Sequence, residues 1–340
     1  MHSLAARFAV PLIGLMVAAC AAANTGATGD AALDRDSVDR FVDEMHREHG
    51  FDTQALHGLF AATRRVQAII DAISKPAEAM PWYRYRPIFI TPERIEAGVA
   101  FLHDHRELLD RAQETYGVDP AIIVAIIGVE TYYGRKTGSY RVLDALATLA
   151  FHYPKRAGFF RGELEHFLLL TRDQDIDPLS LTGSYAGAMG IPQFMPGSYR
   201  HYAVDFDGDR HIDIWTNPAD AVGSVASYLK AHGWRRGEAI AAPAQVPAAG
   251  PGEWLAADLK PVRTYGQFAA AGIVAEPALA AGDRVALIGY ETADGGREYW
   301  FGRENFYAIT RYNRSPLYAL AVVQLAGAIR DGGAPAAPMP

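Results

Sequence analysis

The chain has 340 residues and a mass of 37.0 kDa, and 50% of its residues are apolar while 21% are charged. That length allows two or three domains with a buried core and excludes disorder over most of the chain. A net charge of −7 argues against a nucleic-acid partner, which needs a basic surface. The single cysteine excludes an intrachain disulfide and any CxxC site.

The first 35 residues have the pattern of an export and attachment segment. Residues 1–19 combine a short basic start with an apolar stretch too short to span a bilayer, which predicts a signal peptide. Val17-Ala18-Ala19-Cys20 matches the bacterial lipobox, in which cleavage precedes a cysteine that is then acylated; an ordinary signal peptide with a free thiol is the alternative. Residues 20–35 then serve as a tether. We expect a lipoprotein on the periplasmic side of the outer membrane, or otherwise a soluble periplasmic protein.

Residues 36–117 are predicted to form a helical domain. Apolar residues recur every three or four positions from Val38 to Met45 and again from Val66 to Ile73. The Pro- and aromatic-rich residues 75–90 are expected to form an ordered loop. Thr91, followed by Pro92, predicts the start of one long helix that ends near Gly117.

Residues 118–234 are predicted to form the core of the fold. Helices are expected at 121–133, 140–152, 158–171 and 218–232, separated by an irregular Gly-rich stretch at 183–197. The first of these helices is apolar on every side as far as Glu130, which is typical of a helix at the centre of a core.

Residues 235–303 are predicted to form a small β-containing insertion. Strands are expected at 284–291 and 298–310, joined by a turn at residues 294–296. The helical pattern resumes at 315–330, so residues 304–330 return the chain to the core, and residues 331–340 are expected to be disordered. The fold class is therefore mainly α, of the α+β type.

Glu130 is the most informative residue in the chain. Burial disfavours the ionised carboxyl, and so does the partial negative charge at a helix C-terminus, so we expect its pKa to be raised. A carboxyl that stays protonated near neutral pH can act as a general acid. The helix alone leaves open the alternative that Glu130 belongs to a structural hydrogen-bond network.

The Gly-rich stretch adds a second signal, because small residues allow tight turns and close backbone approach, and Ser184 and Gln193 supply polar groups. Together with Glu130 it resembles the lytic transglycosylases of the membrane-bound B type, relatives of goose-type lysozyme that cleave bacterial peptidoglycan. The resemblance extends in order from residue 36 to residue 330. The segments that carry it are 126–134 (IIGVETYYG), 187–196 (GAMGIPQFMP), 231–234 (AHGW) and 307–315 (YAITRYNRS).

The resemblance implies a lysozyme-like core with an extra helical domain and a small β-containing domain. It also implies that Glu130 protonates the β-1,4 bond between N-acetylmuramic acid and N-acetylglucosamine, then acts as base on the C6 hydroxyl to form a 1,6-anhydro ring. No cofactor is expected for this catalysis. Ordinary glycosidases use two carboxylates, and no second acid occurs in the segments around Glu130. A hydrolase that uses water, or a non-catalytic glycan-binding relative, remains an alternative.

The resemblance further implies a set of substrate contacts. Ser184 would bind the N-acetyl group, Gln193 would hold substrate near Glu130, and the basic pair Lys155 and Arg156 could bind the acidic peptide stem. Packing or solvated-charge roles remain alternatives for the outer positions. The remaining groove residues are Tyr85, Met189, Phe194, Tyr228, Tyr312, Asn313 and Tyr318. The expected partners are peptidoglycan glycan strands and cell-wall synthesis proteins, with the enzyme itself a monomer.

An acidic loop at 205–213 resembles the calcium loop of an EF-hand. It departs from that pattern at position 6, which is Arg210 instead of glycine, and at position 12, where Thr216 replaces the bidentate glutamate. Asp220 could supply the missing carboxylate. The predicted ligands of a structural Ca²⁺ are Asp205, Asp207, Asp209, the carbonyl of His211, Asp213 and Asp220. A solvated acidic loop without a metal is the alternative.

Overall fold

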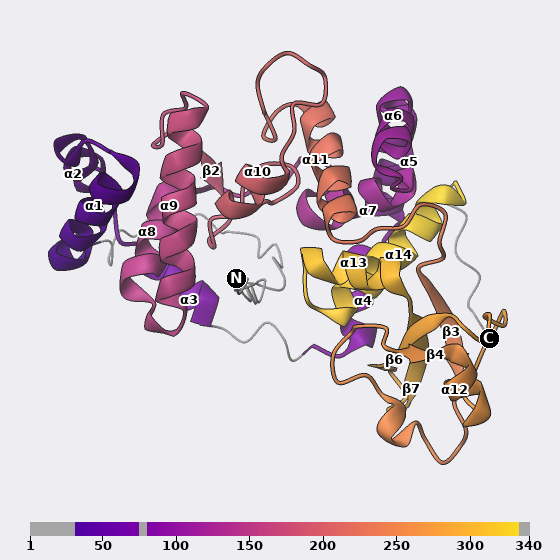
Figure 1. The fold of residues 1–340 in the computed structure, drawn as a ribbon. Helices are drawn as coiled ribbons and strands as arrows, with labels where there is room; N and C mark the ends of the chain where they lie inside the picture. The colour runs from indigo at the N-terminus through magenta and orange to yellow at the C-terminus, as the bar shows by residue number, and fades with distance from the viewer. Residues whose placement is uncertain (1–30, 75–79, 333–340) are drawn as a thin grey trace, which may run out of the picture.

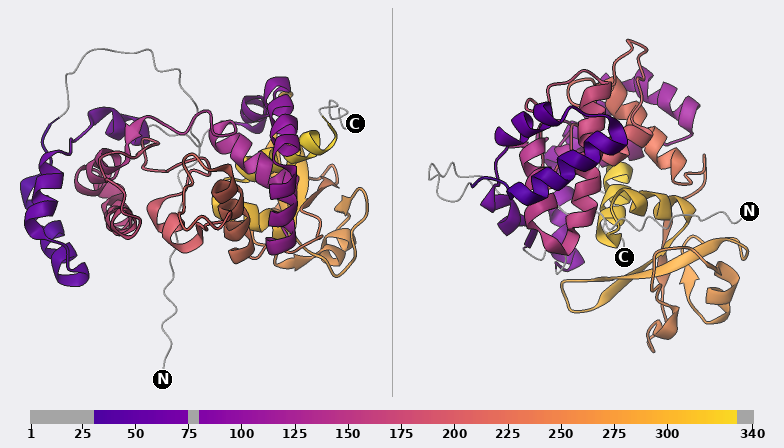
Figure 2. Two further views of the ribbon diagram at one scale, coloured as in Figure 1. Left: turned by 90° about the horizontal axis from the view of Figure 1, so that it is seen from above. Right: turned by 60° about the vertical axis from the view of Figure 1, so that its left-hand side comes forward.

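The computed structural model describes residues 31–74 and 80–332, which form a predominantly helical molecule with a five-stranded sheet and a short two-stranded one. The first two helices and the sheet lie at opposite ends, with the other helices between them (Figures 1 and 2). The predicted mainly helical fold is therefore confirmed, whereas the domain boundaries stay a prediction. The predicted signal peptide, Cys20 and most of the tail lie outside the described residues. Within the described ranges, no helix is both long and apolar enough to cross a membrane.

The first three helices are α1 (Arg35–His49), α2 (Thr53–Ala61) and α3 (Gln67–Ser74). The Asp34 carboxylate caps α1 by accepting the amide of Ser37 at 2.9 Å. The apolar residues expected to face the core, from Val38 to Met45, are buried. Helix α3 packs on α8 (Val142–His152), and the Phe41 ring of α1 contacts the Phe151 ring of α8, so both helices join the N-terminal segment to the rest of the molecule.

The loop predicted for residues 75–90 is wrong for its second half, which forms helix α4 (Trp82–Phe89). Pro87 lies inside this helix, where a proline costs about 3 kcal/mol. Trp82, Tyr85 and Phe89 recur at helical spacing and are all buried, and each buried aromatic side chain contributes roughly 2 kcal/mol. Burial of this aromatic face outweighs the cost of the proline, which is why a prediction based on proline as a helix breaker failed.

The single helix predicted to end near Gly117 is also wrong, because the chain forms α5 (Pro92–Asp104) and α6 (Arg106–Tyr116). Thr91 caps the first helix and Gly117 ends the second, as expected. The backbone leaves helical geometry at His105, with φ −113° and ψ 26°. Helix α5 packs on α7 and α14, whereas α6 packs on α7 and α11. Because α5 and α6 pack on different helices, they need separate helix axes. The local sequence does not encode this need.

Helix α7 (Pro120–Thr131) is the central helix of the core. Residues 121–129 are all buried, and the helix packs against α5, α6, α11 (Pro218–Ala231) and α14 (Pro316–Arg330). Tyr132 and Tyr133 end it in the left-handed region, with φ 52° and 60°. Glu130 lies in the last turn of α7. Because four other helices enclose α7, the position of Glu130 is rigid.

The Gly-rich stretch is anchored at both ends. Strand β1 (Tyr140–Arg141) pairs antiparallel with β2 (Thr182–Gly183), and helix α10 (Pro196–Tyr202) follows the stretch. Helix α10 packs on α9 (Ala157–Asp173), which lies beside α8 and is joined to it by the 3₁₀ turn η1 (Pro154–Arg156). The segment between β2 and α10 is thus irregular but held in place.

The sheet has five strands in the order β4-β6-β7-β3-β5, and all neighbouring strands are antiparallel. Phe268, Ile273, Leu287 and Phe301 form a small core of its own. The strands are β3 (Ala241–Gln245), β4 (Arg263–Thr264), β5 (Val274–Ala275), β6 (Arg284–Glu291) and β7 (Arg297–Gly302), accompanied by η2 (Gly252–Trp254) and α12 (Tyr265–Ala270).

The strand predicted for 298–310 ends at Gly302, and residues 304–312 form helix α13 (Glu304–Tyr312) instead. Aromatic and β-branched residues favour strands when they are considered locally. Phe306, Ile309 and Tyr312 nevertheless recur every three residues and are buried in the main core. Helix α13 packs on α11 and α14, so the chain returns to the helical core directly after the sheet.

Gly190 lies in the turn that leads to Gln193. Its φ is +66°, and a Cβ there would lie 2.5 Å from the backbone oxygen of Ile214. We predict that Gly190→Ala lowers the free energy of unfolding by about 2–4 kcal/mol, through left-handed strain and overpacking together. Gly50→Ala is the matched control, because Gly50 has a φ of +68° with no atom within 4 Å of a Cβ. It should cost only about 1–2 kcal/mol. Equal losses in urea denaturation would contradict a role for the Ile214 contact.

Candidate active site

A pocket lies where the end of α7 meets the Gly-rich stretch, α9, α13 and α14. It brings together six of the residues that the sequence predicted as site residues: Glu130, Ser184, Gln193, Tyr312, Asn313 and Tyr318. The rest of the lining is apolar or aromatic and consists of Phe89, Val129, Phe159, Tyr185, Ala186, Ala188 and Met195. Glu130 is the single carboxyl group among these described lining residues. An apolar pocket with a few convergent polar groups is typical of a ligand site.

The Glu130 side chain is partly exposed in the pocket and is otherwise surrounded by protein atoms. Burial raises the pKa of its carboxyl to about 7, and the hydrogen bond from Tyr318 opposes that rise. The Tyr318 hydroxyl donates to Oε1 of Glu130 at 2.7 Å. A carboxyl with this pKa is protonated in a large fraction of molecules at neutral pH, so Glu130 can both give and take a proton.

Ser184 is held by its own loop. Its Oγ accepts the amides of Ala186 at 3.2 Å and Ala188 at 2.9 Å, and its side chain is almost fully buried. Neither of these bonds uses the hydroxyl hydrogen, so Ser184 retains a donor for a ligand.

Gln193 adopts a left-handed backbone conformation, with φ 53°. Its Nε2 donates to the carbonyls of Thr137 at 3.0 Å and Gly190 at 2.9 Å, which fixes the orientation of the amide. Its Oε1 is buried and has no hydrogen-bond partner among the described residues. Because an unpaired buried acceptor is costly, this oxygen is suited to accept a hydroxyl or amide proton from a bound ligand.

Tyr312 and Tyr318 form one wall of the pocket, with ring centroids 6.5 Å apart and nearly parallel planes. The Tyr312 hydroxyl donates to the carbonyl of Pro192 at 2.6 Å, which ties this wall to the Gly-rich stretch. Burial and the nearby Glu130 carboxylate hold the pKa of both phenols well above the ordinary value, so both hydroxyls stay protonated. Asn313 ends α13, and its Oδ1 accepts the amide of Ser315 at 3.1 Å.

Six of the predicted substrate contacts lie outside the pocket lining, and four of these six are buried. Tyr85 is buried beside Glu130, whose charge contributes to raising the pKa of the Tyr85 phenol. Met189, Phe194 and Tyr228 are buried behind the pocket wall, and Phe194 contacts the rings of both Tyr228 and Tyr312. The Tyr228 hydroxyl donates to the carbonyl of residue 311 at 2.6 Å.

The predicted basic pair lies in η1, at the start of α9. Lys155 is exposed, and the guanidinium of Arg156 lies 4.3 Å from the ring centroid of Phe159. Since Phe159 lines the pocket, Arg156 borders it through this cation–π contact.

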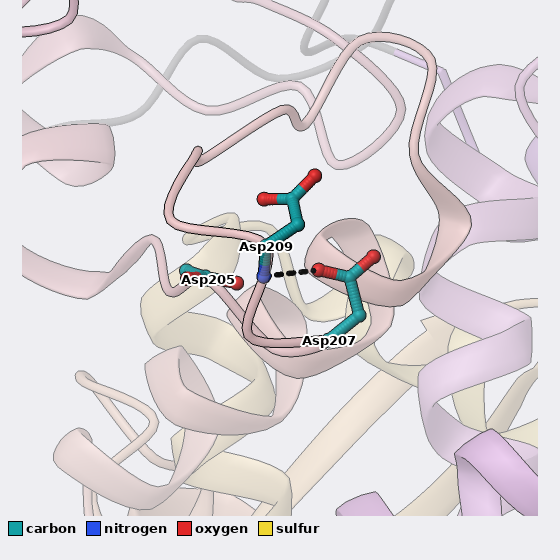
Figure 3. A group of neighbouring side chains, drawn as sticks. All are labelled: Asp205, Asp207 and Asp209. Atoms are coloured by element: carbon teal, nitrogen blue, oxygen red, sulfur yellow. Dashed lines mark hydrogen bonds between the residues drawn. The ribbon is translucent and has the colours of Figure 1, made fainter.

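The acidic loop brings three of its carboxylates together (Figure 3). Asp205, Asp207 and Asp209 each offer a ligand oxygen within 4.8 Å of the others. Arg210, which stands where an EF-hand has glycine, adopts a positive φ of 76° all the same. The amide of Asp209 donates to Asp207 at 3.2 Å, so the loop curls around its own acids. An all-oxygen set of this kind fits a hard cation such as Ca²⁺.

Asp213 and Asp220 are not part of this three-carboxylate group in the described structure. Asp220 is fully buried, and its two oxygens accept the amides of Phe206 and Asp213, each at 2.7 Å. Asp213 accepts the amides of Trp215 and Thr216. Asp220 therefore joins the two ends of the loop by hydrogen bonds. The carbonyl of His211 stays the predicted ligand at position 7 of the loop.

A family model described as Transglycosylase SLT domain matches residues 34–327. The chain belongs to this transglycosylase family. It is 46% identical over 303 residues to membrane-bound lytic murein transglycosylase B of Escherichia coli, a match that covers 86% of this chain and 82% of that protein.

Two solved structures of lytic transglycosylases are similar to this fold. Soluble lytic transglycosylase SltB1 of Pseudomonas aeruginosa matches with a TM-score of 0.83 and 54% identity, over 87% of this chain and 99% of that one. Escherichia coli Slt35, solved in complex with calcium, matches with a TM-score of 0.80 and 46% identity, over 87% and 93% of the two chains. The chain is a lytic transglycosylase that cleaves peptidoglycan.

Sequence reasoning missed three aromatic residues of this transglycosylase pocket. Phe89, Phe159 and Tyr185 line it but come from α4, α9 and the Gly-rich stretch respectively. Tyr185 could have been found, since it directly follows Ser184. Phe89 and Phe159 carry no local signal, because an aromatic residue on a helix is most often part of the core.

Proposed function

We propose that Glu130 is the single acid–base group of this transglycosylase and that its product ends in a 1,6-anhydro ring. The observation that carries this proposal is that Glu130 is the single carboxyl group among the described residues that line the pocket. Its side chain is partly exposed and has a pKa of about 7. A hydrolase of the ordinary kind needs a second carboxylate as nucleophile or to activate water. A non-catalytic binder has no need of a carboxyl with a raised pKa at the end of its central helix.

The reaction then has two proton transfers and no water. The Glu130 proton passes to the glycosidic oxygen as the bond from that oxygen to C1 of N-acetylmuramic acid breaks, and the bonding electrons stay with the oxygen. The C6 hydroxyl of the same ring then attacks C1, and its proton passes to the Glu130 carboxylate. Glu130 ends the cycle protonated, and the atoms balance without a co-reactant.

The neighbouring groups would orient the muramoyl ring. Ser184 retains a hydroxyl hydrogen for the carbonyl oxygen of the N-acetyl group, and the unpaired Oε1 of Gln193 accepts a proton from a sugar hydroxyl or amide. The aromatic rings of Tyr312, Phe159 and Tyr185 suit the flat faces of sugars. Met189, Phe194, Tyr228 and Tyr85 would act from behind this wall, and Asn313 from its edge.

Product analysis tests this proposal directly. Purified peptidoglycan is digested with the mature protein, and the released fragments are analysed by mass spectrometry. Anhydro ends, which are lighter than reducing ends by one water, are the expected result. Reducing ends would favour the hydrolase, and no cleavage would favour the binder, so either outcome overturns the proposal.

We further propose that the acidic loop binds a structural Ca²⁺, as its all-oxygen donor set and the calcium complex of Slt35 support. The ion would brace the loop without entering the reaction.

Saturating Ca²⁺ should therefore raise Tm by about 5 °C, since a ligand at 100 times its Kd adds about 2.7 kcal/mol to the native state. Asp205→Asn with Asp209→Asn should abolish the shift, whereas the exposed surface change Asp173→Asn should leave it intact. A Tm that does not respond to Ca²⁺ or to a chelator would contradict occupancy.

The position of the enzyme in the cell is part of the same proposal. Acylation of Cys20 would attach it to the periplasmic face of the outer membrane, which the membrane-bound relative in Escherichia coli supports. Its partners would be glycan strands and cell-wall synthesis proteins, with the enzyme itself a monomer. Radiolabelled palmitate should label the wild-type chain and not Cys20→Ala.

A further inference from the structure

A buried threonine directly follows Glu130 and contacts the Gly-rich stretch. Thr131 is the last residue of α7, its side chain is 1% exposed, and it does not line the pocket. Its Oγ1 donates to the carbonyl of Ile191 at 2.8 Å and accepts the amide of Gly134 at 3.0 Å. The carbonyl of Ile127, one turn back in the helix, lies farther from the same hydroxyl, at 3.3 Å. The single hydroxyl proton therefore favours Ile191, which is distant in sequence.

The bond from Thr131 holds the turn that carries Gln193, which we call the Gln193 turn (residues 190–193). Thr131 supplies the one donor to the Ile191 carbonyl among the described residues. The next carbonyl of the turn accepts the Tyr312 hydroxyl at 2.6 Å. Gln193 itself has a φ of 53°, a left-handed conformation that persists only when surrounding contacts hold it. Two side-chain hydroxyls from different helices supply such contacts at consecutive carbonyls.

Thr131 also shapes the segment that holds the Gln193 side chain. After α7 the chain folds back, because Thr131 Oγ1 accepts the amide of Gly134 and the Thr131 carbonyl accepts the amide of Lys136 at 2.9 Å. The carbonyl of Thr137, the next residue, accepts Nε2 of Gln193 at 3.0 Å. Thr131 therefore bonds both to the Gln193 turn and to the segment that orients the Gln193 amide.

We propose that Thr131 is a positioning residue for the cleavage reaction, which sets the place of the Gln193 amide relative to the Glu130 carboxyl. The proposal rests on the substrate contact proposed above for Gln193. Glu130 and Thr131 are consecutive in a rigid helix, so the bond from Thr131 to the Gln193 turn connects one polar group of the pocket to the other. A misplacement of about 1 Å can cost about 100-fold in rate. Loss of this hydroxyl outside the pocket should therefore slow the reaction.

The test variant is Thr131→Val, which removes the hydroxyl and keeps the shape of the side chain. The matched control is Thr148→Val in α8. Thr148 is fully buried, its Oγ1 accepts the amide of Val66 at 3.0 Å and donates to the carbonyl of Arg64 at 3.3 Å, and it lies away from the pocket lining. Each variant removes one hydroxyl that joins two segments, so both should lower Tm by a similar amount, about 3 °C.

The rates should differ although the stabilities do not. Thr131→Val should lower kcat/KM for peptidoglycan cleavage about tenfold, whereas Thr148→Val should change it less than about twofold. Thr131→Ser, which retains the hydroxyl, should restore the wild-type rate. All rates are measured well below every Tm, so that loss of folded protein does not contribute. Equal losses in the two valine variants overturn the proposal, and so does a serine variant as slow as Thr131→Val.

A double-mutant cycle with Gln193 tests how Thr131 acts. Gln193→Ala removes the amide, so adding Thr131→Val in that background should change kcat/KM less than about twofold. A tenfold loss that persists without the amide would contradict action through Gln193. If Gln193→Ala lowers the rate and Thr131→Val does not, the positioning role alone fails. If Gln193→Ala leaves the rate unchanged, the proposed substrate contact fails and the positioning role with it.

A binding measurement separates this inference from the proposed reaction. The same cycle is measured as the affinity for purified glycan strands in a Glu130→Gln background. Thr131→Val should weaken binding about tenfold when Gln193 is present and less than about twofold when it is replaced by alanine. If the wild type cleaves no strands, the proposed reaction fails while this comparison still decides the role of Thr131. Equal weakening in the two backgrounds would overturn that role.

Discussion

Glu130→Gln should lower kcat for peptidoglycan cleavage by at least about 1000-fold, because a single positioned acid or base contributes 10²- to 10⁴-fold and Glu130 serves as both. Glutamine keeps the size of the side chain but can neither give nor take the proton. Initial rates of soluble muropeptide release measure the effect. Residual activity above about 1% of wild type would contradict the assignment of Glu130.

Glu163→Gln is the matched control. Burial raises the pKa of Glu163 to about 7 as well, and its carboxylate accepts the amide of Gly197 at 2.8 Å, but it does not line the pocket. It should cost far less activity than Glu130→Gln. A comparable loss in both variants would indicate that buried carboxyls in this core matter for folding and not for chemistry.

The rate should also depend on pH in a defined direction. Burial places the pKa of Glu130 near 7, above the ordinary value of a glutamate, so the acid form predominates below pH 7 and is lost above it. The first proton transfer needs that form. A profile of kcat/KM against pH should therefore fall on the alkaline side of about pH 7.

Tyr318→Phe should have the second largest effect, a loss of about 10- to 100-fold in kcat. The hydroxyl donates to Glu130 at 2.7 Å, so it both orients the carboxyl and stabilises its charged form. Without that hydrogen bond the pKa of Glu130 rises further, and the alkaline limb of the pH profile should move up by about one pH unit. The combination of a lower rate with a shifted limb identifies an effect on Glu130 itself.

Tyr290→Phe controls for the loss of a buried hydroxyl. Tyr290 is also fully buried, and its hydroxyl donates to the carbonyl of Pro316 at 3.1 Å, away from the pocket lining. Its replacement should lower stability, but the alkaline limb should stay in place. A shift of the limb in both variants, or in neither, would contradict the role assigned to Tyr318.

Much of the helical architecture was accessible from sequence because its signals are local. An unbroken apolar run predicted α7 and its central position, Thr91 predicted the start of α5, and Gly117 predicted the end of α6. The predictions failed where tertiary packing overrode local preference. Residues 82–89 and 304–312 form the helices α4 and α13 because a helix buries their aromatic side chains on one face. The helices α5 and α6 are separate at His105 because they pack on different neighbouring helices.

The sequence by itself determined that a carboxyl ends the most apolar helix of the chain and that a Gly-rich turn carries Ser184 and Gln193, since composition and spacing within short segments encode both. Only the tertiary structure decided what surrounds that carboxyl. Tyr318 lies 188 residues from Glu130 along the chain yet donates a hydrogen bond to it. Burial and hydrogen bonding set the pKa of Glu130, and both depend on contacts between segments that are distant in sequence.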